Sequence, residues 1–110
     1  MLLRGIAASR GQVEGVAVKA DSPDEALKKM RNIEKPILVV GFTDPKWVPA
    51  IIKAKGIVTS TGGILSHAAI VSREFGIPSV VGILNAMYSI SDNDCVKVNG
   101  DAGVVEILGG

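Results

Sequence analysis

A strand-to-helix junction between residues 56 and 78 constrains the fold of this chain more than any other feature. Gly56 to Thr59 is a short apolar run, typical of a buried strand, and it leads into the pair Gly62-Gly63. Ser66 is a favourable N-cap residue, and the sequence after it predicts a helix that ends at Gly76, with Pro78 blocking its continuation. A strand that passes through a glycine turn into a helix indicates a mixed α/β domain.

The rest of the chain predicts further strands and two more helices. Ser22, Pro23 and Glu25 combine an N-cap, a first-turn proline and a capping-box glutamate, so a helix should follow them. A second helix should begin close to Pro49, and residues 85–89 should form a helical turn. Gly15 is a candidate bulge. Strands are predicted at 2–9, 13–20, 37–40 and 79–81, with a hairpin of 95–98 and 104–108.

The single histidine, His67, lies in the first turn of the helix predicted after Ser66. The first N–H groups of a helix lack partners inside it and carry partial positive charge, so they attract anions such as phosphate. The same positive end favours the neutral imidazole, which is the form that attacks phosphorus. Gly62 and Gly63 let the backbone approach a bulky anion closely. His67 is therefore predicted to accept a phosphoryl group.

Other roles for this region fit the sequence less well. Ser66 and His67 are neighbours along a helix and do not face each other, so they do not form a hydrolase pair. One histidine and one cysteine are too few for a zinc site, and we expect no metal site. Neither the Walker-type nor the Rossmann-type glycine pattern occurs, so nothing marks an independent nucleotide-binding loop.

The stretch from Ile57 to Gly82, IVTSTGGILSHAAIVSREFGIPSVVG, resembles the phosphohistidine signature of the mobile, or swivelling, domain of phosphoenolpyruvate-utilising enzymes. That family includes phosphoenolpyruvate synthase, pyruvate phosphate dikinase and Enzyme I of the sugar phosphotransferase system. Residues 5–15, 37–49 and 96–105 also resemble the same domain, so the resemblance covers nearly the whole chain. It implies an α/β fold of the swivelling β/β/α sandwich type, as a single domain over residues 1–110.

The resemblance also implies a function. His67 would accept a phosphoryl group from ATP or phosphoenolpyruvate at a partner site and pass it to pyruvate or another acceptor. Mg²⁺ and the nucleotide or phosphoenolpyruvate would be bound by a separate nucleotide-binding or pyruvate/PEP-binding protein, and this chain would bind no cofactor. The family usually has threonine where this chain has Leu65. Without that hydroxyl, the expected phosphate contacts are Gly62, Gly63, Ser66, Thr59 and Thr61.

Length, charge and cysteine content restrict the role further. A chain of 110 residues can bury one core and cannot contain a complete phosphoenolpyruvate synthase. Twelve basic and eleven acidic residues give a net charge of +1, so neither a nucleic acid nor a membrane partner is expected. Cys95 is the only cysteine, which excludes an intrachain disulfide and fits a cytoplasmic location.

Two functions remain open. The first is a stand-alone phosphohistidine carrier domain, a phosphotransferase component that is not a complete enzyme by itself. The second is a non-catalytic regulatory or interaction module that retains the swivelling-domain fold. The glycine pair followed by Ser66-His67 favours the carrier. Met1 opens directly on a predicted strand, which favours a stand-alone protein over an excised fragment of a longer enzyme.

Overall fold

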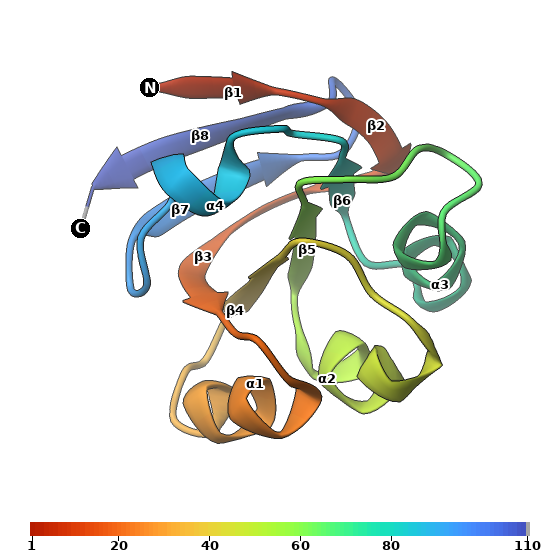
Figure 1. Ribbon diagram of the computed structural model, residues 1–110. Coiled ribbons are helices and arrows are strands. Elements are labelled where there is room, and N and C mark those ends of the chain that lie inside the picture. Colours follow the sequence, from red (N-terminus) through yellow and green to blue (C-terminus); the bar gives the residue numbers. More distant parts are fainter. Residues whose placement is uncertain (110) are drawn as a thin grey trace.

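A mixed sheet organises the chain in the computed structural model, which describes residues 1–109 (Figure 1). Its eight strands follow the order β1-β8-β7-β3-β4-β5-β6-β2. The strands are β1 (Leu2–Arg4), β2 (Ile6–Ser9), β3 (Gln12–Lys19), β4 (Pro36–Val40), β5 (Gly56–Thr59), β6 (Ser79–Val81), β7 (Cys95–Asn99) and β8 (Val104–Gly109). The helices are α1 (Pro23–Met30), the 3-10 turn η1 (Pro45–Trp47), α2 (Val48–Lys53), α3 (His67–Phe75) and α4 (Ala86–Ser89).

The central strands β3, β4, β5 and β6 pair in parallel, and α1, α2 and α3 form the successive crossovers between them. These three helices lie on one face of the parallel strands, as Figure 1 shows. Every residue of β4, β5 and β6 is buried, which explains their continuous apolar runs. No helix in the described part of the chain has the length and apolar character needed to cross a bilayer.

Two hydrophobic cores lie on opposite faces of these parallel strands. The first is formed with the helices and includes Ala26 of α1, Ile51 of α2 and Ala69 of α3. The second is formed with the antiparallel strands and α4 and includes Val96 of β7 and Val105 of β8. Alternate residues of β4 point to the two cores, as expected for a pleated strand. The result is three layers: helices, parallel strands and antiparallel strands.

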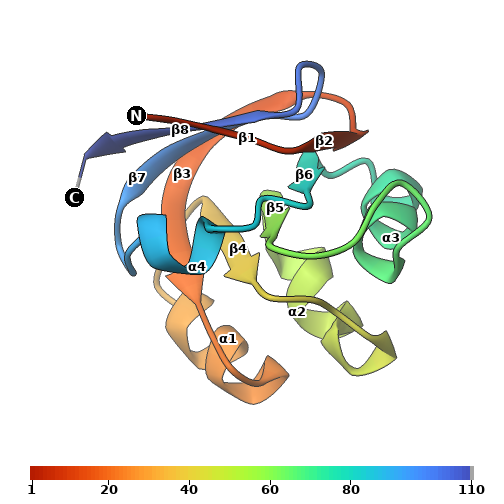
Figure 2. The ribbon, with the colours of Figure 1, turned by 45° about the horizontal axis from the view of Figure 1, so that its top comes forward.

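The single strand predicted from Leu2 to Ser9 is wrong, because the chain divides at Gly5. β1 pairs with β8 and β2 pairs with β6, and these pairs stand at opposite ends of the strand order. The two outer strands of the sheet, β1 and β2, follow one another directly in the chain. The sheet therefore curves until its two edges meet, where β1 runs into β2 (Figure 2). The Gly5 N–H donates to the Gly103 carbonyl at 2.9 Å where the two edges meet.

The bulge predicted at Gly15 is also wrong. Gly15 pairs with Val96 without a change of register, and it is required for space, since a Cβ there would overlap the Lys35 carbonyl oxygen. The register shifts instead in β2, between Ala7 and Ser9.

Candidate functional site

His67 is the first residue of α3, and it lies where the loop after β5 meets that helix. Ser66 is the N-cap, as predicted: its backbone is extended, with φ −70° and ψ 158°, and its Oγ accepts from the Ala69 N–H at 3.4 Å. The same hydroxyl donates to the Gly63 carbonyl at 2.7 Å. Gly76 ends the helix in the left-handed conformation, with φ 66°. Local sequence thus places the imidazole at a capped helix start.

The His67 ring is held by a residue that the sequence analysis missed. Thr43 lies in the loop after β4, and its Oγ1 is 2.8 Å from His67 Nδ1. Thr43 is buried, while His67 itself is half-buried. Nδ1 is thus engaged, whereas Nε2 has no hydrogen-bond partner among the described residues. A polar residue shortly after a buried parallel strand was the available signal, since the carboxyl ends of neighbouring parallel strands gather at one edge of the sheet.

The two threonines predicted to contact phosphate both donate hydrogen bonds to backbone carbonyls. Thr59 is fully buried, and its hydroxyl donates to the Thr61 carbonyl at 2.7 Å. Thr61 is exposed, and both its N–H and its hydroxyl donate to the Gly41 carbonyl, at 3.1 and 2.9 Å. These bonds tie the start of the loop to the end of β4.

The glycine pair divides into two different positions. Gly62 has φ 100°, a conformation that favours glycine, and a Cβ there would lie 2.8 Å from Ser66 Cβ. Gly63 has no such φ, and a Cβ there would meet no atom within 4 Å. The turn therefore requires only the first glycine, while the second leaves open space beside the loop.

This loop and the first turn of α3 contain several unpaired backbone N–H groups. Within residues 1–109, the N–H groups of residues 62–65, 67 and 68 have no acceptor. Between residues 56 and 91 the only charged side chains are Arg73 and Glu74. Arg73 donates to the carbonyls of Ala8 and Ile64. An anion at this loop would be held mainly by backbone N–H groups and the helix end.

No metal site is found in the part of the chain that the structure describes. None of its histidine, cysteine, aspartate and glutamate side chains form a group of three or more that could hold a metal ion.

Comparisons with known proteins agree with this geometry. A family model described as "PEP-utilising enzyme, mobile domain" matches residues 33–103. A phosphoenolpyruvate synthase of Aeropyrum pernix is 46% identical over 105 residues, covering 96% of this chain and 13% of the relative. A rifampicin phosphotransferase of Bacillus cereus is 41% identical over 105 residues, covering 94% of this chain and 12% of the relative. The chain thus spans about an eighth of the length of these two relatives.

Solved structures share the fold. The solution structure of Enzyme I (nEIt) matches with a TM-score of 0.61 and 28% identity, over 72% of this chain and 33% of that one. The swivelling β/β/α sandwich predicted from the sequence is confirmed by this match and by the three layers described above. With a family model matched over more than half of its length, this chain belongs to the mobile-domain family of PEP-utilising enzymes.

Proposed function

We propose that this chain is a phosphohistidine carrier, in which His67 Nε2 accepts a phosphoryl group at one partner site and delivers it at another. The donor is ATP or phosphoenolpyruvate, and the acceptor is pyruvate or another molecule. One observation carries the proposal: an imidazole fixed through Nδ1 by Thr43 stands at a helix start whose loop offers unpaired N–H groups. The proposed setting is the cytoplasm, which the single cysteine fits.

In the proposed carrier, the proton of the neutral ring lies on Nδ1, the nitrogen next to Thr43. In the reactive tautomer, Nδ1 carries the hydrogen and donates it to Thr43 Oγ1, and Nε2 presents its lone pair. That lone pair forms the N–P bond while the bond from phosphorus to the donor oxygen breaks, and the leaving oxygen keeps the electron pair. The loop N–H groups stabilise charge on the phosphoryl oxygens. Onward transfer reverses these roles, with the acceptor oxygen attacking phosphorus and Nε2 leaving.

Charge distribution supports a separate partner for the metal and the nucleotide. Phosphoryl transfer is accelerated mainly by metal ions and cationic side chains. The one cationic side chain between residues 56 and 91 is Arg73, and it is engaged with two carbonyls. Mg²⁺ and the donor are therefore assigned to a nucleotide-binding or pyruvate/PEP-binding protein against which this chain moves.

Relatives support placing the choice of acceptor outside this chain. The phosphoenolpyruvate synthase and the rifampicin phosphotransferase differ in the activity that their names state, yet both are more than 40% identical to this chain. A module that serves both activities at this similarity specifies the phosphohistidine, while the partner specifies the acceptor. By this argument, the carrier is one component of a phosphotransferase.

The test is phosphorylation in the presence of a partner. The purified chain is incubated with Mg²⁺ and ATP labelled at each phosphate in turn, or with labelled phosphoenolpyruvate. The partner is a phosphoenolpyruvate synthase relative from which its own mobile domain has been removed. We expect label on the wild type and none on His67→Ala, with thermal unfolding as the control for folding. A phosphoramidate is lost in acid and survives base.

The outcomes separate the two functions. Label that resists acid, or that persists in His67→Ala, contradicts the carrier. Absence of label with every donor and partner favours the alternative, a regulatory or interaction module that keeps the swivelling-domain fold.

A further inference from the structure

Arg73 joins the loop before His67 to the edge of the sheet. Its Nη1 donates to the Ala8 carbonyl at 3.0 Å, and its Nη2 donates to the Ile64 carbonyl at 2.6 Å. Ala8 belongs to β2 and Ile64 to the loop that precedes α3, so one guanidinium connects α3 both to its own leading loop and to a strand 65 residues away. The register shift between Ala7 and Ser9 falls at Ala8, where the strand departs from regular pairing with β6.

The loop has few other restraints between its two ends. Thr61 is bonded to the end of β4, and Ser66 caps α3. Among the described residues, the Arg73 bond to Ile64 is the only hydrogen bond between residues 62–65 and a group outside the segment 62–66. The side chains contribute little packing, since Ile64 is 56% exposed and Leu65 is 82% exposed. The position of this loop therefore depends strongly on one guanidinium.

We propose that Arg73 is a positioning residue for the phosphoacceptor site. It fixes the loop whose unpaired N–H groups receive the phosphoryl oxygens, relative to the imidazole that Thr43 contacts. Donors fixed in advance stabilise transferred charge without reorganisation, and small displacements of such groups slow reactions strongly. Arg73 acts through the loop, and its guanidinium is already engaged with protein carbonyls. This inference rests on the proposed function of His67.

Arginine is specifically suited to this role. Its planar guanidinium carries several N–H donors in a rigid fork, so it can reach two carbonyls at once, whereas a lysine ammonium is a point charge on a flexible stem. Arg73→Lys keeps the charge and loses the simultaneous pair of hydrogen bonds to the Ala8 and Ile64 carbonyls. A role that depended on positive charge alone would survive this substitution.

The experiment uses phosphoramidate, a small phosphoryl donor that needs no partner protein. Nε2 forms the N–P bond as the P–N bond of phosphoramidate breaks, and ammonia leaves after gaining a proton from solvent. The rate of His67 phosphorylation is followed by ³¹P NMR for the wild type, Arg73→Lys and Arg73→Ala. The control is Arg10→Ala, which removes an exposed arginine from the same hollow of about 740 Å³ without removing a bond to the loop.

We expect Arg73→Ala to be slower by at least about tenfold, Arg73→Lys to recover only part of the rate, and Arg10→Ala to match the wild type. Methylguanidinium, added at millimolar concentrations that leave the fold intact, should partly restore Arg73→Ala. Methylammonium at equal ionic strength should not. A purely structural effect of the substitution would not respond to this rescue. In the unmodified protein, ¹⁵N relaxation should show increased motion at residues 62–65 of Arg73→Ala.

The phosphorylation rates and the relaxation data distinguish failure of the Arg73 positioning role from failure of the proposed function of His67. If the wild type takes no phosphoryl group, the proposed function fails, and the relaxation data still test the restraint on the loop. If the wild type is phosphorylated and Arg73→Ala reacts equally fast, or residues 62–65 stay as rigid as before, the positioning role is overturned. Wild-type rates in Arg73→Lys would show that charge alone is required.

Discussion

At the scale of single residues, the hydroxyl side chains near His67 bond mostly to the backbone of the protein. Four hydroxyls lie between the end of β5 and the start of α3, and those of Thr59, Ser60, Thr61 and Ser66 each donate to a backbone carbonyl. The hydroxyl that reaches the imidazole comes instead from Thr43, in another loop. The side-chain contacts of this loop therefore serve its shape, and the unpaired backbone N–H groups are the donors that the proposed function assigns to the phosphoryl oxygens.

Thr43→Val should slow phosphorylation of His67 by about 10- to 100-fold, because the ring loses the partner that selects its tautomer and orientation. Some phosphate should then appear on Nδ1, and two-dimensional NMR of the imidazole distinguishes the two nitrogens. The lost hydrogen bond should lower the free energy of unfolding by about 1 kcal/mol, measured in urea.

Thr43→Ser is the matched control, since it keeps the hydroxyl and removes a methyl group. It should retain Nε2 phosphorylation at nearly the wild-type rate. If Thr43→Val also reacts at that rate and only at Nε2, the contact with Nδ1 has no part in the chemistry.

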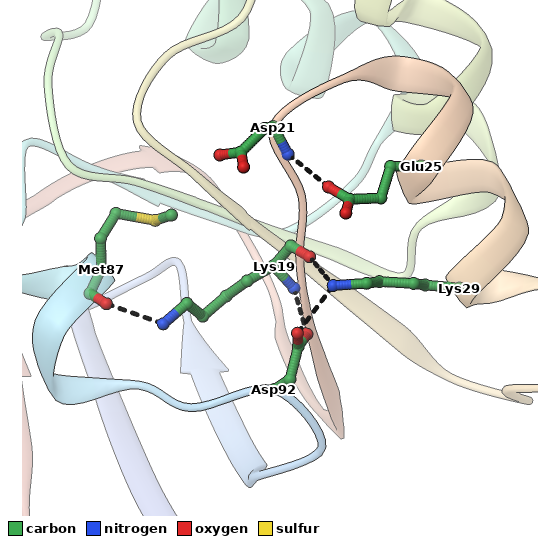
Figure 3. Close-up of polar contacts among 6 residues, drawn as sticks. All are labelled: Lys19, Asp21, Glu25, Lys29, Met87 and Asp92. Carbon is green, nitrogen blue, oxygen red and sulfur yellow. Dashed lines mark hydrogen bonds and ion pairs between the residues drawn. The ribbon is translucent and has the colours of Figure 1, made fainter.

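At the scale of elements, a polar network connects β3 to α1 and α4 at the carboxyl edge of the sheet (Figure 3). Asp92 accepts from the Lys19 N–H and from Lys29 Nζ, both at 2.7 Å. Lys19 Nζ donates to the Met87 carbonyl of α4 at 2.8 Å, and Lys29 Nζ also donates to the Lys19 carbonyl at 2.7 Å. The network thus holds two helices against the end of one strand.

The pKa values of the ion pair shift in opposite directions. Partial burial by itself raises the pKa of the Asp92 carboxyl, but the bonds from Lys29 and the Lys19 N–H outweigh it and leave that pKa below its ordinary value of 3.8. The hydrogen bond to Asp92 raises the pKa of Lys29 above its ordinary value of 10.5, against a smaller lowering by burial.

Asp92→Asn should lower the free energy of unfolding by about 0.5–1 kcal/mol near neutral pH, a small effect because both side chains are more than a third exposed. The contribution of Asp92 is complete above its ordinary pKa and is lost as pH falls through the lower folded value. That of Lys29 is complete below its ordinary pKa and is lost as pH rises through the raised folded value. The difference in the free energy of unfolding between Asp92→Asn and the wild type should therefore become smaller at very low and at very high pH.

Urea denaturation across the acid range measures that difference. Glu34→Gln, at an exposed carboxylate with no hydrogen bond among the described residues, is the control. A difference that grows towards acid would contradict the assigned direction.

The local elements were predictable because their signals lie within a few residues of one another. Ser22 and Pro23 start α1, Ser66 starts α3, and Gly76 ends it, as the sequence predicted. Thr43 could not be placed in the same way, since it meets His67 across 24 residues of chain. The glycine pair predicted a tight turn, but only the folded backbone shows that Gly62 has the left-handed conformation.

At the scale of the whole molecule, the missing information was which edges of the sheet come together. The local sequence predicts that residues 2–9 are extended, but it does not identify their partners. β1 and β2 lie at opposite ends of the strand order, and Gly5 is the residue between them in the chain. The local pattern is the same for one long strand and for two short ones that close a sheet.

The closure predicts a strict requirement for glycine at position 5. A Cβ on Gly5 would lie 2.6 Å from both the Val81 carbonyl oxygen and Ile83 Cγ1, and the first of these is backbone that cannot turn aside. Gly5→Ala must therefore separate β2 from β6 or shift the contact with Gly103, and the free energy of unfolding should fall by about 2–3 kcal/mol. Gly41→Ala is the control, because its Cβ would meet only Ser60 Oγ at 3.7 Å, an ordinary contact. Urea denaturation measures both variants, and amide exchange should show faster opening of β1 and β2 in Gly5→Ala. Equal stability of the two variants would mean that the edges of the sheet do not meet at Gly5.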